Sequence, residues 1–386
     1  MLIDIIKIIK NLEQEHTNRL LSDTEDLIDN YYLDSFIYYC HAILRNIYEN
    51  IDYEDMAKNI RFLINNFRKL KTFKIMSNNC EQRTDAWYMR RHNMVTASDM
   101  YKVLKNNKNR HNLLYKKVKP YEKTWRRIKA CEWGTKYEDV AKKIYEIKNK
   151  TLVHEFSCLP HPKYPFIGAS PDGISELGKM LEIKCPYSRK ITGIPLDSYY
   201  TQMQIQLEVC DYEECDFLEC KFIEITKEEY INLNLDSKLN DNPKEEENVN
   251  TEYAGCIISL EQNDKLRHWY SEVNLNILDL EKWVEKNICK IKKIAEAINN
   301  KNFDIDIECD DIEMINMFLI EVKYWRIDKY SCVVVKRDRD WFNNNIGQIT
   351  DFWNSVEHYR LKGVDTIPYY QAPLLKKFTK YAFLDD

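Results

Sequence analysis

The 386-residue sequence is poor in glycine and proline, with 8 and 10 residues respectively, and it lacks patterns that mark several common classes of protein. It contains no GxxxxGK[ST] pattern, which argues against a nucleoside triphosphatase, and no GxSxG pattern, which argues against that kind of serine hydrolase. Its apolar runs are shorter than the ~20 residues that a membrane-spanning helix needs. The formal net charge of −5 excludes a surface that is basic throughout. We therefore expect a soluble protein without a membrane partner, whose contacts with any nucleic acid are local.

The 12 cysteines include no CxxC pair. The N-terminus, MLIDIIKIIKNLEQE, has none of the regions of a secretory signal peptide, so we expect reduced thiols in an intracellular protein. Cys210, Cys215 and Cys220 recur at a constant spacing in a strand-like stretch with no histidine nearby. Zinc and iron–sulfur sites normally place their ligands in paired, turn-forming spacings, so we expect neither site there.

The apolar pattern divides the chain into four segments. Residues 1–78 carry apolar residues at helical spacing and predict a helical N-terminal extension, whose apolar stripes form a core or, alternatively, bind a partner. Residues 79–226 mix helices and strands. Residues 227–318 predict a largely helical insertion, with an acidic loop to about residue 250 and helices from about residue 260. Residues 319–386 predict a last core strand, a closing helix and a C-terminal tail.

Within residues 79–226 the order of elements indicates the fold class. The pattern predicts helices over 133–145 and 199–209, strands over 152–159, 180–186 and 215–226, and a strand ending at Ile174. A further strand is predicted over 324–338 and a helix over 344–359. Helices that alternate with strands in this way predict an α/β fold, with helices packed on the faces of one sheet.

The strongest chemical signal is Ser170-Pro171-Asp172-Gly173-Ile174, followed by Glu182-Ile183-Lys184. Alternation along a strand puts Glu182 and Lys184 on one face and Ile183 in the core, while the Asp-Gly turn brings Asp172 to the end of the neighbouring strand. Two such carboxylates can hold Mg²⁺, which polarises a phosphoryl group and acidifies water, while the lysine stabilises developing charge.

Taken alone, this spacing of acidic and basic residues is a weak signal, and the alternative is a solvated strand edge with a surface ion pair. Three features strengthen the catalytic interpretation. Pro171 and Gly173 fix the turn, and apolar residues supply a buried strand face. Glu138 lies on the amphipathic helix upstream, from which it could complete a metal site.

Several blocks in this order resemble one family, the lambda-type exonucleases, also called the YqaJ-like viral recombinase nucleases, within the PD-(D/E)xK superfamily. The blocks are Trp87–Arg91, Thr96–Ser98, Gly134–Glu138, Gly168–Gly173, Leu181–Pro186, Tyr200–Gln204 and Tyr330–Asp338. They cover about half of the chain. The resemblance implies a restriction-endonuclease-like core, a mixed central sheet flanked by helices, and a source such as a large DNA virus or a phage.

The resemblance also assigns roles to individual residues. It implies metal ligands at Asp172, Glu182 and Glu138 and at the backbone carbonyl of Ile183, with Lys184 as the catalytic lysine. Gln202 would line the catalytic site, and contacts to a 5′-terminal phosphate would come from Arg91, Ser98 and Ser170, since guanidinium and hydroxyl groups suit that dianion. The alternatives are structural: Ser98 as a helix N-cap, Arg91 as a surface cation and Gln202 as a helix-face amide.

Residues 101–130 form a basic run that contains Glu122 as its one acidic residue. We interpret the run as a surface that follows DNA phosphates, with contacts from Lys116, Lys117, Arg126 and Arg127. A solvated helix face is the alternative. Three aromatic residues are interleaved with the run and could stack on bases or pack in the core: Tyr115, Tyr121 and Trp125.

Together these features predict a Mg²⁺-dependent DNA nuclease, with Mn²⁺ as a substitute ion. The resemblance implies a 5′→3′ exonuclease on linear duplex DNA, acting in recombination, repair or replication alongside a single-strand annealing partner protein. One alternative is a structure-selective endonuclease on the same fold, and another is a non-catalytic DNA-binding or assembly protein. The N-terminal extension and the insertion have no counterpart in the family, so its trimeric ring and its processivity do not carry over.

Overall fold

The computed structural model describes residues 1–21, 27–77, 82, 84–105, 108–122, 128–233, 253–262, 265–299 and 319–370. Its centre is a seven-stranded mixed sheet in the order β2-β5-β6-β7-β10-β8-β9. Strands β6 and β7 are parallel, and the other neighbouring pairs are antiparallel. The strands are β2 (Val153–His154), β5 (Gly173–Ser175), β6 (Met180–Lys184), β7 (Glu214–Ile225), β8 (Ala254–Gln262), β9 (Lys265–Tyr270) and β10 (Leu319–Lys336). The predicted α/β class with a mixed central sheet is confirmed.

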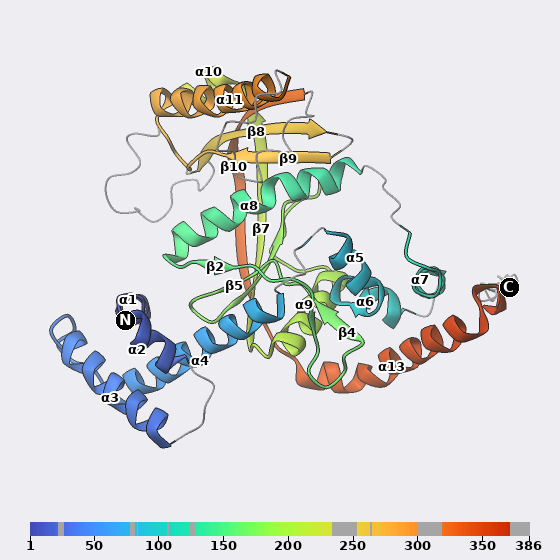
Figure 1. Cartoon of the computed structure of the whole chain (residues 1–386), viewed down its shortest axis with the longest axis horizontal. Helices are drawn as coiled ribbons and strands as arrows, with labels where there is room; N and C mark the ends of the chain where they lie inside the picture. The colour runs from blue at the N-terminus through green and yellow to red at the C-terminus, as the bar shows by residue number, and fades with distance from the viewer. Residues whose placement is uncertain are drawn as a thin grey trace, which may run out of the picture.

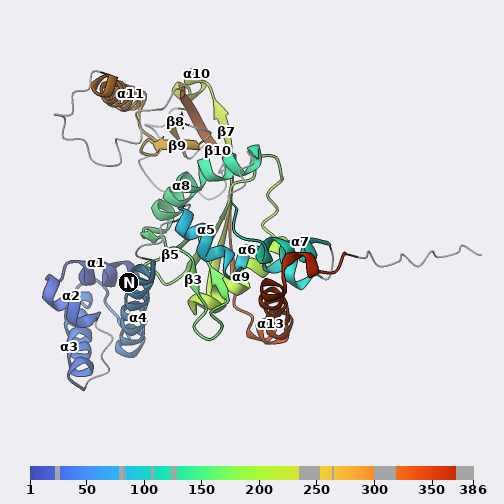
Figure 2. The ribbon, with the colours of Figure 1, turned by 45° about the vertical axis from the view of Figure 1, so that its right-hand side comes forward.

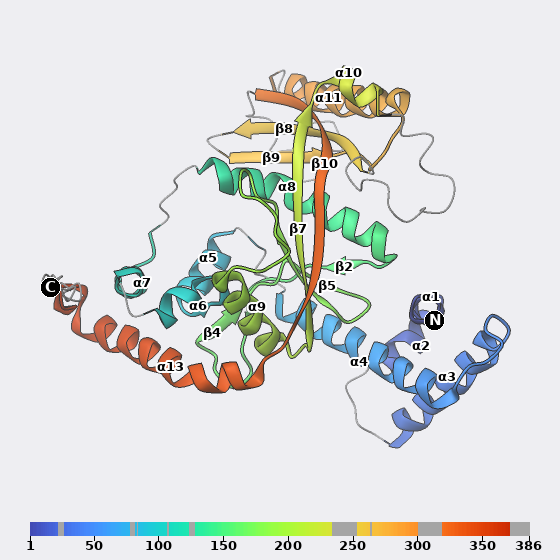
Figure 3. The ribbon, with the colours of Figure 1, turned by 180° about the vertical axis from the view of Figure 1, so that it is seen from behind.

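Helices cover both faces of this sheet, as Figures 1 and 3 show. On one face α8 (Lys129–Asn149) packs its residues Tyr137, Val140 and Ile144 against Leu181, Ile183 and Leu218 of β6 and β7. The other face carries α6 (Ala97–Leu104), α9 (Asp197–Cys210) and α13 (Arg339–Lys362). Helix α9 connects the parallel strands β6 and β7, so it is the crossover helix on this face of the sheet.

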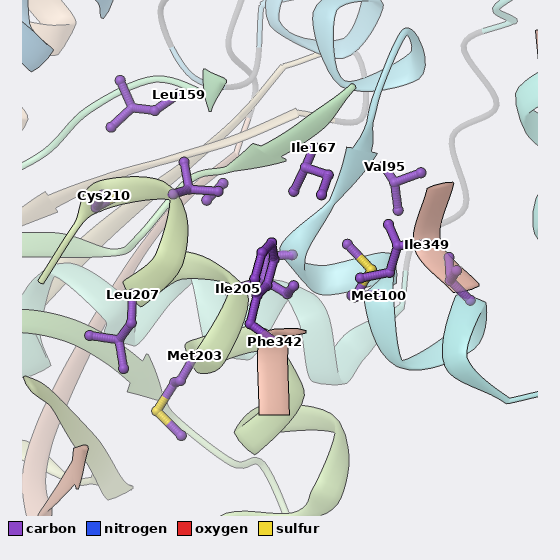
Figure 4. Packing of buried hydrophobic residues seen from close by; sticks show 14 of the residues in the cluster. Val95, Met100, Leu159, Ile167, Met203, Ile205, Leu207, Cys210, Phe342 and Ile349 are labelled. Carbon is purple, nitrogen blue, oxygen red and sulfur yellow. The ribbon is translucent and has the colours of Figure 1, made fainter. Parts of the chain in front are cut away.

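A second, three-stranded sheet supports the helices on the α9 side, in the order β1-β4-β3. Its strands are β1 (Val95–Thr96), β3 (Leu159–Pro160) and β4 (Ile167–Ala169). Figure 4 shows how apolar side chains fill the space between this sheet and the helices, among them Val95 and Ile167 from the strands and Met100, Ile205 and Ile349 from the helices. Helix α5 (Asp85–His92) contacts β1, and helix α7 (Lys108–Val118) packs against α6 and α13.

The N-terminal extension is helical, as predicted, with α1 (Leu2–Lys10), α2 (Gln14–Leu20), α3 (Leu27–Leu44) and α4 (Tyr53–Ser77). These helices share their own apolar core to one side of the sheet (Figure 2). Asn66 of α4 anchors them, since its buried Nδ2 donates to the carbonyls of Ser175 at 3.2 Å and Glu176 at 2.9 Å. The hydroxyl of Tyr212 donates to Asn66 Oδ1 at 2.7 Å.

The insertion differs from the predicted loop followed by helices. A short helix, α10 (Lys227–Ile231), begins directly after β7, where Thr226 and Glu229 form a capping box. Residues 254–262 and 265–270 then form the antiparallel strands β8 and β9, and α11 (Ile277–Asn299) is the predicted helix among the described residues of the insertion. The helix predicted from about residue 260 was wrong for the end of β8 and for β9, because a short apolar run fits a buried strand and a buried helix equally well. Pairing with β10 decides between them.

Parts of two predicted segments, the insertion and the C-terminal tail, cannot be compared with the structure. The C-terminal segment 371–386 and residues 234–252, 263–264 and 300–318 of the insertion lie outside the described residues. Within the described parts of the chain, no helix has the length and apolar character that crossing a bilayer requires.

Cys210 and Cys215 are fully buried, and burial raises the pKa of both thiols, to about 12 for Cys210. The raised pKa disfavours the thiolate form that metals bind.

Candidate active site

The sequence places one carboxylate directly before β5 and another within its neighbour β6, and the structure brings the two together. Asp172 directly precedes β5, which pairs with β6 through Gly173 and Leu181. Its Oδ2 accepts a hydrogen bond of 2.6 Å from the backbone N–H of Ile183, so the turn is tied to the middle of β6. Glu182 lies beside it on β6 and is fully buried.

Lys184 extends from the same face of β6 as Glu182, as alternation predicts, while Ile183 enters the core beneath α8. The ammonium of Lys184 donates to Glu182 Oε1, and Lys184 Nζ lies 5.0 Å from the ring centroid of Tyr199. Burial disfavours the charged ammonium, but the carboxylates of Glu182 and Asp172 outweigh burial and raise the pKa of Lys184. Lys184 is therefore a permanent cation inside the site.

Gln206 on α9 is a site residue that the sequence analysis missed. Its Nε2 donates to Glu182 Oε2 at 2.7 Å and lies 3.4 Å from the carbonyl oxygen of Ser170, so it links the helix to β6 and to the segment between β4 and β5. The predicted amide, Gln202, is half-buried one helical turn earlier on α9. The signal that could have found Gln206 is the four-residue spacing, which puts it on the same helix face as Gln202.

We predict that Gln206→Leu lowers the free energy of unfolding by about 1–3 kcal/mol, because a buried carboxylate oxygen loses its donor. The measurement is denaturant unfolding, with Mg²⁺ absent. Gln202→Leu is the matched control on the same helix, and we expect it to cost less. An equal cost for the two variants would contradict the assigned role of Gln206.

A cavity of about 510 Å³, the catalytic cavity, opens on this site. Its wall includes Glu138 of α8, Ile183 and Lys184 of β6, and Arg189. Arg189 pairs with Glu219, a fully buried residue of β7 that lies opposite Lys184 in the strand register. The predicted position of Glu138, on a helix that faces the end of β6, agrees with this cavity wall.

Repulsion among the carboxylates makes this site favourable for a bound cation. Burial, Glu182 and Glu138, in that order of effect, raise the pKa of Asp172 well above its usual range. Gln206 adds a buried oxygen, Oε1, that has no hydrogen-bond partner among the described residues. Oxygen donors of this kind fit Mg²⁺. Among the described residues, no three His, Cys, Asp or Glu side chains are grouped closely enough to hold a metal ion as they stand. Glu138 lies on the wall of the cavity beside Lys184, near enough to Asp172 to raise the pKa of that carboxyl.

The residues predicted to bind a terminal phosphate also come together, although they lie on different elements. Arg91 Nη2 donates to Ser98 Oγ at 3.0 Å, and Arg91 Nη1 lies 3.4 Å from Ser170 Oγ. The alternative role for Ser98 was wrong, because α6 begins at Ala97 and its N-cap is Thr96. The Ser98 hydroxyl instead contacts Arg91 and, at 3.2 Å, the hydroxyl of Thr96.

A second cavity of about 480 Å³, the end cavity, lies beside these residues. Arg91, Ser98, Lys116 and Lys117 line it. Its aromatic members include Trp87, over which the Arg91 guanidinium lies at 4.3 Å, and Tyr88 and Tyr121, which stack at 6.4 Å. Cys131 and Thr135 of α8 line both cavities, so the two cavities are neighbours.

The basic run divides into two kinds of residue. Lys116 is exposed on α7 at the end cavity, as expected of a DNA contact. Lys117 is only 4% exposed, donates to the carbonyl of Arg91 at 2.7 Å and lies 3.8 Å from Asp99, so a solvated helix face does not describe it. Burial lowers the pKa of Lys117 to about 8. Arg126, Arg127 and Trp125 lie outside the described residues.

The chain is similar in sequence to proteins of large DNA viruses. Residues 86–213 match the YqaJ-like viral recombinase domain. The chain is 26% identical over 316 residues to an uncharacterized protein of Acanthamoeba polyphaga mimivirus, over 72% of this chain and 53% of the relative. It is 29% identical over 155 residues to a protein of African swine fever virus, over 32% of this chain and 45% of that protein.

Among solved structures, an alkaline exonuclease from Laribacter hongkongensis is similar, with 18% identity and a TM-score of 0.42 over 72% of this chain and 95% of that chain. The chain spans about half the length of the curated relatives that it matches.

Proposed function

Because the chain carries a YqaJ-like viral recombinase domain over residues 86–213, we propose that it is a Mg²⁺-dependent deoxyribonuclease that hydrolyses phosphodiester bonds. One observation carries the proposal: Asp172 and the buried Glu182 meet beside the cation Lys184 at the mouth of a cavity. This is the charge arrangement that metal-assisted hydrolysis of a phosphodiester needs, and a decayed, non-catalytic fold has no need of it.

Each residue has a separate task in this proposal. Asp172, Glu182, the carbonyl of Ile183 and Glu138 would hold Mg²⁺, which when bound polarises the phosphoryl group and makes water more acidic; Mn²⁺ has the same preference for oxygen ligands. Lys184 places positive charge where negative charge develops on the phosphoryl oxygens. Gln206 holds the Glu182 carboxylate in its orientation.

The end cavity supports action at DNA ends, so we propose a 5′→3′ exonuclease on linear duplex DNA. Arg91, Ser98 and Ser170 present one guanidinium and two hydroxyls, which suit a dianionic terminal phosphate better than an internal diester. A strand whose 5′-phosphate lies there would pass the shared residues Cys131 and Thr135 to reach Lys184. Such an activity supplies single strands for recombination, repair or replication, and a single-strand annealing protein is the partner that this product implies.

Digestion of defined substrates tests the proposal. Linear duplexes with 5′-phosphate, 5′-hydroxyl or blocked ends, and a closed circle, are incubated with Mg²⁺ or with EDTA. We expect cleavage of the linear duplexes with Mg²⁺ only, fastest with 5′-phosphate ends. Equal cleavage of the closed circle would replace the exonuclease with a structure-selective endonuclease. No cleavage of any substrate would favour a DNA-binding or assembly protein.

We predict that Arg91→Ala and Lys116→Ala have different effects. Arg91→Ala should reduce the preference for 5′-phosphate over 5′-hydroxyl ends about tenfold, because a charge-assisted contact to the terminal group is lost. Lys116→Ala should weaken binding to all DNA and lower the salt dependence of affinity by about one unit of slope. The measurement is the ratio of cleavage rates at matched salt, together with binding at several salt concentrations. A wild type without end preference would refute the pocket assignment.

A further inference from the structure

Part of the wall of the end cavity comes from the insertion and not from the nuclease core. Leu266 and His268 of β9 line this cavity together with Arg91 and Ser98. Alternation along β9 puts Leu266 and His268 on one face, and Arg267 between them on the other. Strand β9, which lies where a helix was predicted, therefore reaches the site where a DNA end is proposed to bind.

The sheet fixes the position of His268. It pairs in register with Ser259 of β8, and the Ser259 hydroxyl lies 2.9 Å from His268 Nδ1. Strand β8 is in turn paired along its length with β10, which belongs to the core. The imidazole is therefore presented to the cavity by a continuous hydrogen-bonded sheet, and its orientation does not depend on a loop.

The end cavity is larger than a phosphate group requires. A volume of about 480 Å³ lies within the range of pockets that enclose a whole small ligand. Its cations, Arg91, Lys116 and Lys117, suit the phosphate. Its aromatic and apolar members, Tyr88, Tyr121 and Leu266 among them, suit a base or a sugar, since a base stacks on any aromatic face.

We propose that Leu266 and His268 contact the terminal nucleotide of the DNA strand, and that the insertion thereby sets the selectivity of this protein for strand ends. The inference rests on the proposed nuclease function and deepens it. Leu266 supplies apolar contact to the sugar or base, and the imidazole of His268 supplies a polar contact that Ser259 orients. A continuous strand has no terminal nucleotide that could contact these two residues.

Binding in EDTA tests the proposal without cleavage. The probes are a duplex with open, 5′-phosphorylated ends and a duplex of the same sequence with both ends closed by hairpin loops. We expect His268→Ala and Leu266→Ala to weaken binding of the open duplex about five- to tenfold and to leave binding of the closed duplex unchanged. His268→Gln, which keeps a polar side chain within reach of Ser259, should recover part of the loss.

Controls separate this effect from misfolding. His154→Ala removes a histidine from β2, at the opposite edge of the seven-stranded sheet, and should leave both affinities unchanged. Thermal unfolding identifies any variant that has lost its fold. If one of the variants Leu266→Ala and His268→Ala is unfolded, binding by the other, folded variant is enough to test the proposal. Unchanged affinity for the open duplex would overturn the proposal, as would an equal loss for the closed duplex. If the wild type cleaves no DNA but these binding ratios hold, the nuclease function fails and the end contact stands.

Discussion

Lys184→Ala is expected to lower the rate of Mg²⁺-dependent cleavage by two to three orders of magnitude, or about 10²–10³-fold, while DNA binding changes little. The ammonium lies inside the site against Glu182, and in the proposed mechanism it would act on charge that develops during the reaction, so its contribution would belong to the transition state. Single-turnover cleavage with saturating enzyme measures the effect, and binding in EDTA measures the affinity.

Two features make this experiment decisive. Lys190→Ala is the control, because Lys190 is an exposed lysine that follows the same strand. The variant at 184 also leaves the buried Glu182 carboxylate without its cation, so we expect lower thermal stability in EDTA and recovery with Mg²⁺. Wild-type turnover in Lys184→Ala would remove Lys184 from the mechanism.

Asp172→Asn is expected to slow cleavage strongly and at the same time to stabilise the protein in EDTA. The amide oxygen can still accept from the Ile183 N–H, but the negative charge beside Glu182 and Glu138 is gone. Since burial and these carboxylates disfavour ionised Asp172, its removal should raise the free energy of unfolding by on the order of 1 kcal/mol. The cleavage rate should fall about a thousandfold.

Thermal unfolding with and without Mg²⁺ separates the two effects. The wild type should gain stability on addition of Mg²⁺, because a ligand that binds the folded state stabilises it, whereas Asp172→Asn should gain much less. Asp365→Asn, an exposed aspartate after α13, is the control and should behave as the wild type. A variant that is less stable in EDTA than the wild type would contradict the repulsion among the carboxylates.

The sequence predicted the catalytic strand because its physics is local. Alternation in a five-residue strand is enough to put Glu182 and Lys184 on one face and Ile183 on the other, and an Asp-Gly turn is enough to place Asp172. The resemblance added Arg91, Ser98 and Ser170, whose proximity no local pattern shows, since 79 residues separate Arg91 from Ser170.

What the sequence could not show depends on pairing between distant segments. Gln206 and Gln202 are equivalent in a helical pattern, and only the packing of α9 against β6 makes Gln206 the partner of Glu182. His268 carried no signal, because a strand was not predicted there and its approach to the end cavity follows from the sheet order β10-β8-β9. Lys117 appeared to be one more surface lysine until its burial beneath Arg91 was seen.

The two longest strands have a consequence for how the molecule unfolds. β10 runs for 18 residues, and its first half pairs with β8 of the insertion while most of its length pairs with β7 of the core. An added segment built on shared strands cannot melt and leave the rest intact, so we expect its backbone amides to exchange hydrogen with deuterium in one cooperative event with those of β7. The β8–β9 part of the sheet thereby shares the stability of the central strands β7 and β10.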